Sequence, residues 1–290
     1  MSRTTLHAWL LLTPALVLLV AFTHYPAAAT FWHSLLSTPR ASRPARWVGL
    51  DNYEALLDDP VFWQALWNNV IYAGATIPLS IGLALAMALW VNGRIAGRGL
   101  LRMAYFTPTV LPMIAVANLW LFFFTPDYGL LDQLTAALFG WGPTNWIGQS
   151  ETALGAMIAV AVWKEAGFFM IFYLAALQAI PPSLYEAAAI EGASRWTVFR
   201  RVTLPLLGPT TLFILVNAVI NGFRLVDHII VMTRGGPNNA TQLLLTYIYE
   251  VGFRFWDTAL AAALTLVLLV ILAAAASFQF FVLGKRTYYR

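Results

Sequence analysis

Long apolar runs alternate with short polar segments along most of the chain. A helix needs about 20 mostly apolar residues to cross the hydrocarbon core of a bilayer. Six stretches reach this length, at approximately 9–31, 70–91, 103–125, 152–177, 206–232 and 258–283. The pattern predicts an all-α membrane protein of six transmembrane helices, organised as a single transmembrane domain over residues 1–290.

Composition agrees with a lipid environment. Hydrophobic residues make up 60% of the chain and charged residues only 10%, too few to cover a water-exposed surface of this size. The net charge of +4 reflects basic residues placed near the ends of the spans, as membrane topology requires. We therefore expect no nucleic-acid partner. The chain has no cysteine, and its four histidines lack metal-ligand spacing, so we predict no metal site.

Basic residues near span ends predict the orientation, because Lys and Arg are retained on the cytoplasmic side. With both termini in the cytoplasm, ten basic residues fall inside and five outside. The inside set is Arg3, Arg94, Arg98, Arg102, Arg195, Arg200, Arg201, Lys285, Arg286 and Arg290. The outside set is Arg40, Arg43, Arg46, Arg234 and Arg254, of which the first three oppose the rule within one long loop.

The N-terminal stretch has a second interpretation. Arg3, an apolar run and Ala27-Ala28-Ala29 together resemble a cleaved signal peptide. The run over 9–31 is long enough to span and contains Trp and Phe beyond the needs of a signal core, which favours a first transmembrane helix. In the loop that follows, residues 49–63 interleave acidic and apolar positions, which predicts short helices on the membrane face.

In the segment 181–205, between the fourth and fifth spans, the positions of Pro, Ser and Gly predict two short helices. Pro181-Pro182 ends the fourth span, and Ser183 with Glu186 predicts a capping box at the start of a short helix. Gly192 supplies the permissive backbone that ends it. A second short helix with three arginines then leads to Pro205. The segment could serve only as a well-capped connector between spans. That role does not explain its small-residue surface followed by a bulky apolar one, which indicates a partner that docks closely.

This segment resembles the cytoplasmic signature EAA-x3-G-x9-I-x-L-P of binding-protein-dependent ABC importer permeases. The matching residues are Glu186, Ala187, Ala188, Gly192, Leu204 and Pro205, whereas Val202 stands where Ile is usual. The resemblance implies a coupling helix that seats in a groove of an ABC ATPase dimer. It also implies an extracytoplasmic solute-binding protein and a second permease subunit, as a heterodimer in the carbohydrate branch.

Similarity continues outside the loop. Four further segments resemble the carbohydrate-type branch of these permeases: Phe22-x-x-Tyr25-Pro26 and residues 48–53, 235–241 and 247–253. This resemblance implies uptake of a sugar, with glycerol-3-phosphate or a related polyol phosphate as the alternative. The chain itself would bind no cofactor, since ATP and Mg²⁺ would be used by the partner ATPase.

Polar and charged residues inside the spans are candidates for the solute pathway, because such groups are costly in lipid and face the protein interior or a wet path. Asn217, Asn221, Arg224 and His228 recur at intervals of 4, 3 and 4, which predicts one helical face. Asp227 either pairs with Arg224 to hold helices together or shares the pathway role. In the fourth span, the candidates are Trp163 and Lys164, with Glu165 beside them expected to find a different partner from Lys164.

A secondary transporter and an intramembrane enzyme are the two alternative function classes. A secondary transporter would need a coupling-ion site of its own, and an intramembrane enzyme would need a nucleophile or metal motif. The sequence contains no G-x-x-x-x-G-K-[ST] phosphate loop, no H-E-x-x-H and no G-x-S-x-G. We therefore expect a non-catalytic translocation subunit rather than an enzyme.

Overall fold

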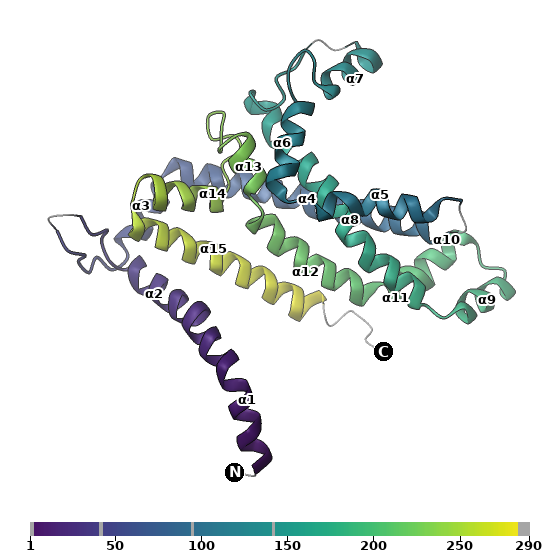
Figure 1. The fold of residues 1–290 in the computed structure, drawn as a ribbon, viewed down its shortest axis with the longest axis horizontal. Coiled ribbons are helices and arrows are strands. Elements are labelled where there is room, and N and C mark those ends of the chain that lie inside the picture. Colours follow the sequence, from purple (N-terminus) through teal and green to yellow (C-terminus); the bar gives the residue numbers. More distant parts are fainter. Residues whose placement is uncertain (1–2, 41–42, 94–95, 141–142, 284–290) are drawn as a thin grey trace. The chain divides into compact units, whose positions relative to one another are not determined.

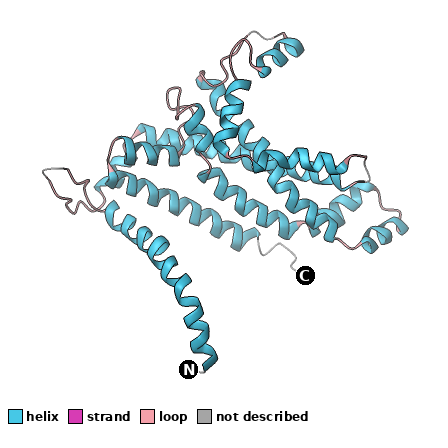
Figure 2. Ribbon diagram, viewed as in Figure 1, coloured by secondary structure: helices cyan, strands magenta, loops and turns pink. Residues whose placement is uncertain are grey.

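The computed structural model describes residues 3–40, 43–93, 96–140 and 143–283, which are helical over most of their length (Figures 1 and 2). In these ranges the extended pairing is limited to two isolated bridges, Leu36 with Trp47 and Arg40 with Arg43. Five helices are long and apolar enough to cross a membrane, and a bent pair brings the number to six. The predicted all-α membrane fold is confirmed.

The described residues form nineteen helical elements. Four of them, labelled η, are π-helical segments of five residues. In chain order they are α1 (Arg3–Leu19), η1 (Val20–His24), α2 (Tyr25–Ser34), α3 (Asp51–Leu57), α4 (Pro60–Asn92), α5 (Arg98–Val110), α6 (Met113–Phe123), α7 (Leu130–Phe139), α8 (Ser150–Ala179), α9 (Pro182–Ile190), α10 (Arg195–Val198), η2 (Phe199–Thr203), α11 (Leu204–Leu206), α12 (Gly208–Arg224), α13 (Asp227–Met232), α14 (Leu244–Tyr249), η3 (Glu250–Arg254), α15 (Thr258–Phe278) and η4 (Gln279–Leu283).

Internal contacts divide the chain into two compact units, which are described separately. Unit 1 comprises Met1–Phe62 and Tyr247–Val270, and unit 2 comprises Trp63–Thr246 and Ile271–Arg290. The predicted cytoplasmic charges Arg94, Lys285, Arg286 and Arg290 lie outside the described residues.

Unit 1 joins the first span to the short helix α3, one of the helices expected on the membrane face. Asn52 donates from its side-chain amide to the carbonyls of Ser34 and Leu36, at 2.7 and 2.8 Å. The Tyr53 hydroxyl donates to Ser34 Oγ at 2.8 Å. These bonds satisfy carbonyls at the end of α2, where no helical N–H is available, and they fix α3 beside it.

A tyrosine and a carboxylate tie α14 to the beginning of α4 within the same unit. The Tyr247 hydroxyl donates to Asp59 Oδ2, while the other oxygen of Asp59 accepts from the Val61 N–H at 2.9 Å. Burial, followed by the hydrogen bond to Asp59, raises the pKa of Tyr247 above its ordinary value. The phenol therefore remains a proton donor at neutral pH.

Unit 2 contains the long helices α4, α8 and α12, and α5 lies along α8 (Figure 1). One core cluster joins α4, α8 and α12 through residues such as Ala84, Phe169, Tyr173 and Ala218. A second cluster joins α6, α8 and α13, with Val116, Met157 and Ile229 among its members. Small residues recur in both clusters, which lets the helix backbones approach closely without a hydrophobic driving force in lipid.

The third span is broken, which corrects the prediction of one continuous helix over 103–125. The helices α5 and α6 meet at an angle of 104° across Leu111-Pro112. The residue before a proline is pushed out of the helical region, and Leu111 has φ −72° and ψ 136°. Pro112 also lacks the N–H that would bond the Pro108 carbonyl, so the helix cannot continue through it.

The fifth span has a second break, between α12 and α13. Leu225 has φ −84° and ψ 88°, and regular helix resumes only at Asp227. The predicted single face of Asn217, Asn221, Arg224 and His228 therefore does not hold, because a change in backbone direction separates His228 from the other three.

We expect Gly167→Ala to lower the free energy of unfolding by about 1–3 kcal/mol, the usual cost of overpacking. A Cβ at Gly167 in α8 would lie 2.1 Å from the Tyr105 carbonyl oxygen of α5, so the two helices would have to separate. Gly155→Ala is the matched control on the same helix, because a Cβ there meets nothing within 4 Å. Reversible unfolding in mixed SDS micelles measures both. Equal stability of the two variants would contradict the close α5–α8 contact.

Candidate functional site

The loop 181–205 forms the predicted helix, turn and second helix. The first helix, α9, begins at Pro182 instead of Ser183, because Pro is already suited to the first helical position. The predicted capping box is therefore wrong: no side chain caps α9, and Pro181 occupies the N-cap position in an extended conformation.

Gly192 ends α9 as predicted. Its φ of +70° lies in the left-handed region, where residues with a Cβ are strained. The Gly192 N–H donates to Ala189 O and the Ala193 N–H donates to Ala188 O, at 3.1 and 3.0 Å. These bonds satisfy the last carbonyls of the helix and reverse the chain toward α10.

The second helix is capped by Ser194, whose Oγ accepts from the Thr197 N–H at 3.2 Å. It continues through η2 and α11 toward the fifth span. A bond of 3.3 Å between the hydroxyls of Tyr185 and Thr203 links the two arms of the loop. The loop is thus a braced structural unit rather than a free connector.

One face of this loop packs inward and the other is exposed. Leu184 and Tyr185 pack against the cluster that includes Leu177 and Leu207. Glu186 and Ala187 are exposed, while Ala188 is buried. Ile190 and Trp196 are 89% and 67% exposed, and Trp196 stacks on Phe199 with ring centroids 5.5 Å apart. Apolar groups that project from a charged loop in this way form a ready docking surface.

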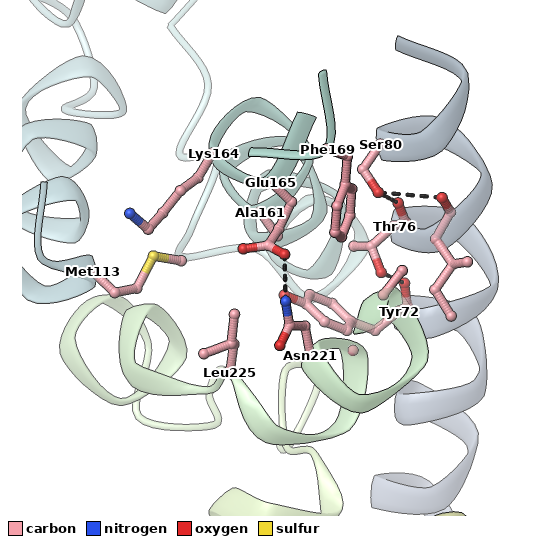
Figure 3. A pocket seen from close by; sticks show the side chains of 13 residues that line it. Tyr72, Thr76, Ser80, Met113, Ala161, Lys164, Glu165, Phe169, Asn221 and Leu225 are labelled. Atoms are coloured by element: carbon pink, nitrogen blue, oxygen red, sulfur yellow. Dashed lines mark hydrogen bonds between the residues drawn. The ribbon is translucent and has the colours of Figure 1, made fainter. Parts of the chain in front are cut away.

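A small cavity lined by both polar and apolar residues lies inside unit 2, where α4, α8 and α12 meet α6 (Figure 3). Its volume of about 20 Å³ is enough for a water molecule and too small for a sugar. Tyr72, Thr76 and Ser80 line it from α4, at intervals of four residues that place them on one helical face. Glu165 lines it from α8 and Asn221 from α12.

Glu165 and Asn221 form the central polar contact of this cavity. Asn221 donates from Nδ2 to Glu165 Oε2 at 2.6 Å, which joins the fourth and fifth spans. Figure 3 shows the carboxylate directed toward Asn221, with Tyr72 close by. The pair combines donor and acceptor groups that suit a hydroxyl-rich solute.

Lys164 also borders the cavity, but its ammonium group bonds to backbone. It donates to the carbonyls of Pro108, Thr109 and Leu111, at 3.0, 3.4 and 2.6 Å. These are the oxygens left without helical partners at the break of the third span. Lys164 thus takes the place of the N–H that Pro112 lacks, and the expectation that Lys164 and Glu165 have different partners is confirmed.

The other predicted pathway residues do not line this cavity. Trp163 packs edge-on against Trp120, with ring centroids 5.6 Å apart, and borders a separate apolar groove between α4 and α8. The side chain of Asn217 bonds back to the Phe213 carbonyl of its own helix, at 2.8 Å. Their role in solute binding stays a prediction.

The two charges of the fifth span lie apart from each other. Arg224 and Asp227 are both exposed, and within the described part of the chain they form no ion pair, because Leu225 and Val226 turn the backbone between them. His228 is fully buried, and its Nε2 lies 3.2 Å from the Tyr72 hydroxyl.

Sequence reasoning missed the α4 side of the cavity. Tyr72, Thr76 and Ser80 each look unremarkable in an apolar span, although their four-residue spacing was a usable signal. The Thr76 and Ser80 hydroxyls donate to carbonyls one turn earlier, at 2.7 and 2.6 Å, and this internal bonding lets them reside in lipid.

Residues 77–286 match the family model described as "Binding-protein-dependent transport system inner membrane component". The chain belongs to this family of transport permeases. The permease is 35% identical over 284 residues to the lactose transport system permease protein LacF of Rhizobium radiobacter, covering 97% of this chain and 95% of LacF. It is 34% identical over 283 residues to the sn-glycerol-3-phosphate transport system permease protein UgpA of Agrobacterium fabrum, covering 97% and 96%.

A solved structure has the same fold. It is the crystal structure of a bacterial ABC transporter involved in the import of the acidic polysaccharide alginate, and the similarity has a TM-score of 0.86 at 24% sequence identity. The match covers 99% of the permease and 98% of that chain. Family membership makes this chain an inner-membrane permease subunit of an ABC importer, and the structural match confirms its fold.

We predict that Lys164→Met lowers the free energy of unfolding by about 1–3 kcal/mol, because buried carbonyls at the span break lose their donor. Lys164→Arg keeps donors at this position and should lose less. Glu165→Gln, at the neighbouring position, is the control, since an amide oxygen still accepts from Asn221. Unfolding of the purified permease complex measures all three, and a fully stable Lys164→Met would contradict the capping role.

Proposed function

We propose that this permease forms one half of the translocation path for a carbohydrate-type solute, driven by ATP hydrolysis in a separate ABC ATPase dimer. The observation that carries the proposal is the braced loop 181–205, whose exposed Glu186, Ala187 and Ile190 precede the left-handed turn at Gly192. A rigid, partly apolar projection is what a groove in an ATPase would hold. The chain itself binds no cofactor in this scheme, and its partner uses ATP and Mg²⁺.

The topology follows from the same assignment. If the loop 181–205 faces the ATPase, both termini lie in the cytoplasm, which agrees with the distribution of ten basic residues to five. The loops on the other side would then receive solute from the extracytoplasmic binding protein. A second, related permease would complete the path as a heterodimer, because the polar groups of Glu165 and Asn221 border a space of about 20 Å³, too small for a sugar.

The chemistry of the cavity supports a neutral, hydroxyl-rich solute. Its polar groups are the carboxylate of Glu165, the amide of Asn221 and the hydroxyls of Tyr72, Thr76 and Ser80. Such groups donate to and accept from sugar hydroxyls. The lactose permease among the relatives agrees with this class.

Glycerol-3-phosphate is the second candidate, favoured by the 34% identity with UgpA. A phosphate would need a cation, and Lys164 is already bonded to three carbonyls. The polar groups around the cavity therefore suit a sugar better than a phosphate, once the cavity has widened.

The mechanism is alternating access. Closure of the ATPase dimer would displace the loop around Glu186 to Gly192, and α8 and α12, which flank this loop in the chain, would rock with it. The cavity at Glu165 and Asn221 would widen when these helices separate, admitting solute from the outer side.

Co-purification tests the assembly. The permease is extracted from its native membrane in mild detergent, accompanying subunits are identified by mass spectrometry, and the complex is assayed for ATPase activity. An ATPase and a second permease are expected. A chain that purifies alone and transports on an ion gradient would instead be a secondary transporter.

We expect Gly192→Asp to leave the permease folded and inserted but to reduce ATP-driven uptake at least tenfold. The substitution places a charged side chain at the docking face, at a residue whose φ is +70°. Nothing lies within 4 Å of the new Cβ, so packing inside the chain is undisturbed. Gly192→Asn is the control, because Asn tolerates the left-handed region and adds no charge. Normal uptake by the Asp variant in proteoliposomes would remove the coupling assignment.

Asn221→Leu should raise the KM for solute-stimulated transport roughly tenfold, because an amide that bonds hydroxyls is replaced by an apolar group and Glu165 loses its donor. Asn118→Leu in α6 is the matched control, since that amide is exposed and bonds only to Ile114 O of its own helix, at 2.8 Å. Uptake at several sugar concentrations separates KM from the maximal rate. If both variants behave alike, the cavity is not part of the path.

A further inference from the structure

Three arginines that oppose the topology rule lie together in unit 1. Residues 36–40 and 43–47 form a short hairpin, in which Ser37 N donates to Arg46 O at 2.8 Å. Arg40 and Arg43 exchange backbone hydrogen bonds at 2.9 and 2.8 Å, so they lie directly opposite each other with their side chains on one face. Like charges in this arrangement are destabilising unless an anion neutralises them.

The chain does not supply that anion from its described residues. Within them, the side chains of Arg40, Arg43 and Arg46 form no ion pair and no hydrogen bond. Two carboxylates, Asp51 and Asp257, line the same cavity as the three arginines. Asp257 is already engaged, because it accepts from the Thr38 hydroxyl and from the Leu260 N–H. Three arginines therefore face two carboxylates, and a positive charge remains.

The hairpin borders a cavity of about 480 Å³, in the size range of small-molecule sites. Its other walls come from α3 and from the residues before α15. Thr38 anchors the hairpin there, since its Oγ1 donates to Asp257 and accepts from the Ala259 N–H at 3.0 Å. We call this space the arginine cavity. Hydrogen bonds to backbone groups hold its walls in place.

The position of the cavity along the membrane normal follows from the helix before it. The apolar helix Trp9–Ser34 has 26 residues, which at 1.5 Å each cover roughly 39 Å, more than the hydrocarbon core of about 30 Å. Trp32 and Trp47 contact each other at the base of the hairpin, with ring centroids 5.4 Å apart, and both are exposed. Exposed Trp residues favour the headgroup level. The arginine cavity therefore begins where lipid phosphates lie.

We propose that the arginine cavity binds the phosphate of an anionic phospholipid headgroup. The planar guanidinium fork matches phosphate oxygens in a bidentate geometry. A bound phosphate would neutralise the opposed Arg40 and Arg43 and fasten the hairpin to the membrane surface. This site also explains why three arginines are tolerated on the predicted outer side. An acidic surface of a protein partner could also pair with them, but the depth of the site favours lipid.

Native mass spectrometry of the purified permease complex tests the proposal, with dioleoyl phosphatidylglycerol and dioleoyl phosphatidylcholine as probes. The wild type should retain phosphatidylglycerol preferentially. The double variant Arg40→Ala/Arg43→Ala should lower its affinity for this lipid roughly 30-fold, at about fivefold per arginine. Arg40→Lys/Arg43→Lys keeps the charge but loses the fork, so an intermediate loss is expected.

Arg254→Ala is the matched control, because Arg254 is also on the predicted outer side but is paired with Glu250 at 2.8 Å and does not line the cavity. It should bind phosphatidylglycerol like the wild type. Equal retention of both lipids by the wild type, or an equal loss in Arg254→Ala and the double variant, would overturn the proposal. The proposal would also be overturned if the double variant bound lipid normally but no longer responded to its solute-binding protein. That result would identify the cavity as a protein-docking surface.

Discussion

The ammonium group of Lys164 bonds to carbonyl oxygens that the break at Leu111-Pro112 leaves without helical donors. In water this break would cost little, because solvent would bond the exposed backbone. Inside a bilayer each unsatisfied carbonyl costs several kcal/mol, so irregular backbone exists only where the protein supplies a partner. One charged side chain therefore makes possible the 104° bend of the third span, and its own charge is solvated by the backbone it caps.

The same bonds determine the chemistry of the neighbouring cavity. Lys164 and Glu165 are adjacent in sequence but point in different directions around α8. Because the ammonium is held at α5, the carboxylate is left to bond Asn221, and the third, fourth and fifth spans are joined by two polar contacts of different kinds. Gly167, one turn from Lys164, allows the α5 backbone to approach close enough for the cap to form. Packing and polar bonding are thus mutually dependent here.

Apart from the capping box at Ser183, the sequence predicted what depends on local chemistry and missed what depends on tertiary partners. Apolar length identified the spans, and Gly192 identified a helix end, because both follow from solvent and backbone preferences that act locally. Pro112 is a sequence signal for a break in the third span. The donor that bonds the freed carbonyls, Lys164, lies over fifty residues away in the sequence. No proline lies at the break after Arg224, and Gly222 just before it is part of regular helix, so the apparent single face of the fifth span was misleading. The contact of Trp163 with Trp120 also joins distant parts of the sequence, and its pathway role stays a prediction.

The loop 181–205 and the cavity at Glu165 share one contiguous block of packed side chains. Leu184 and Tyr185 of α9 pack against a cluster that includes Leu177 at the end of α8 and Leu207 before α12. The same cluster reaches Phe169 and Ala218, which line the cavity beside Glu165 and Asn221. Because protein interiors are close-packed and nearly incompressible, a displacement of α9 cannot be absorbed within this block and must shift α8 against α12. The contact between Glu165 and Asn221 spans those two helices, so it is the polar bond that such a shift would open or close.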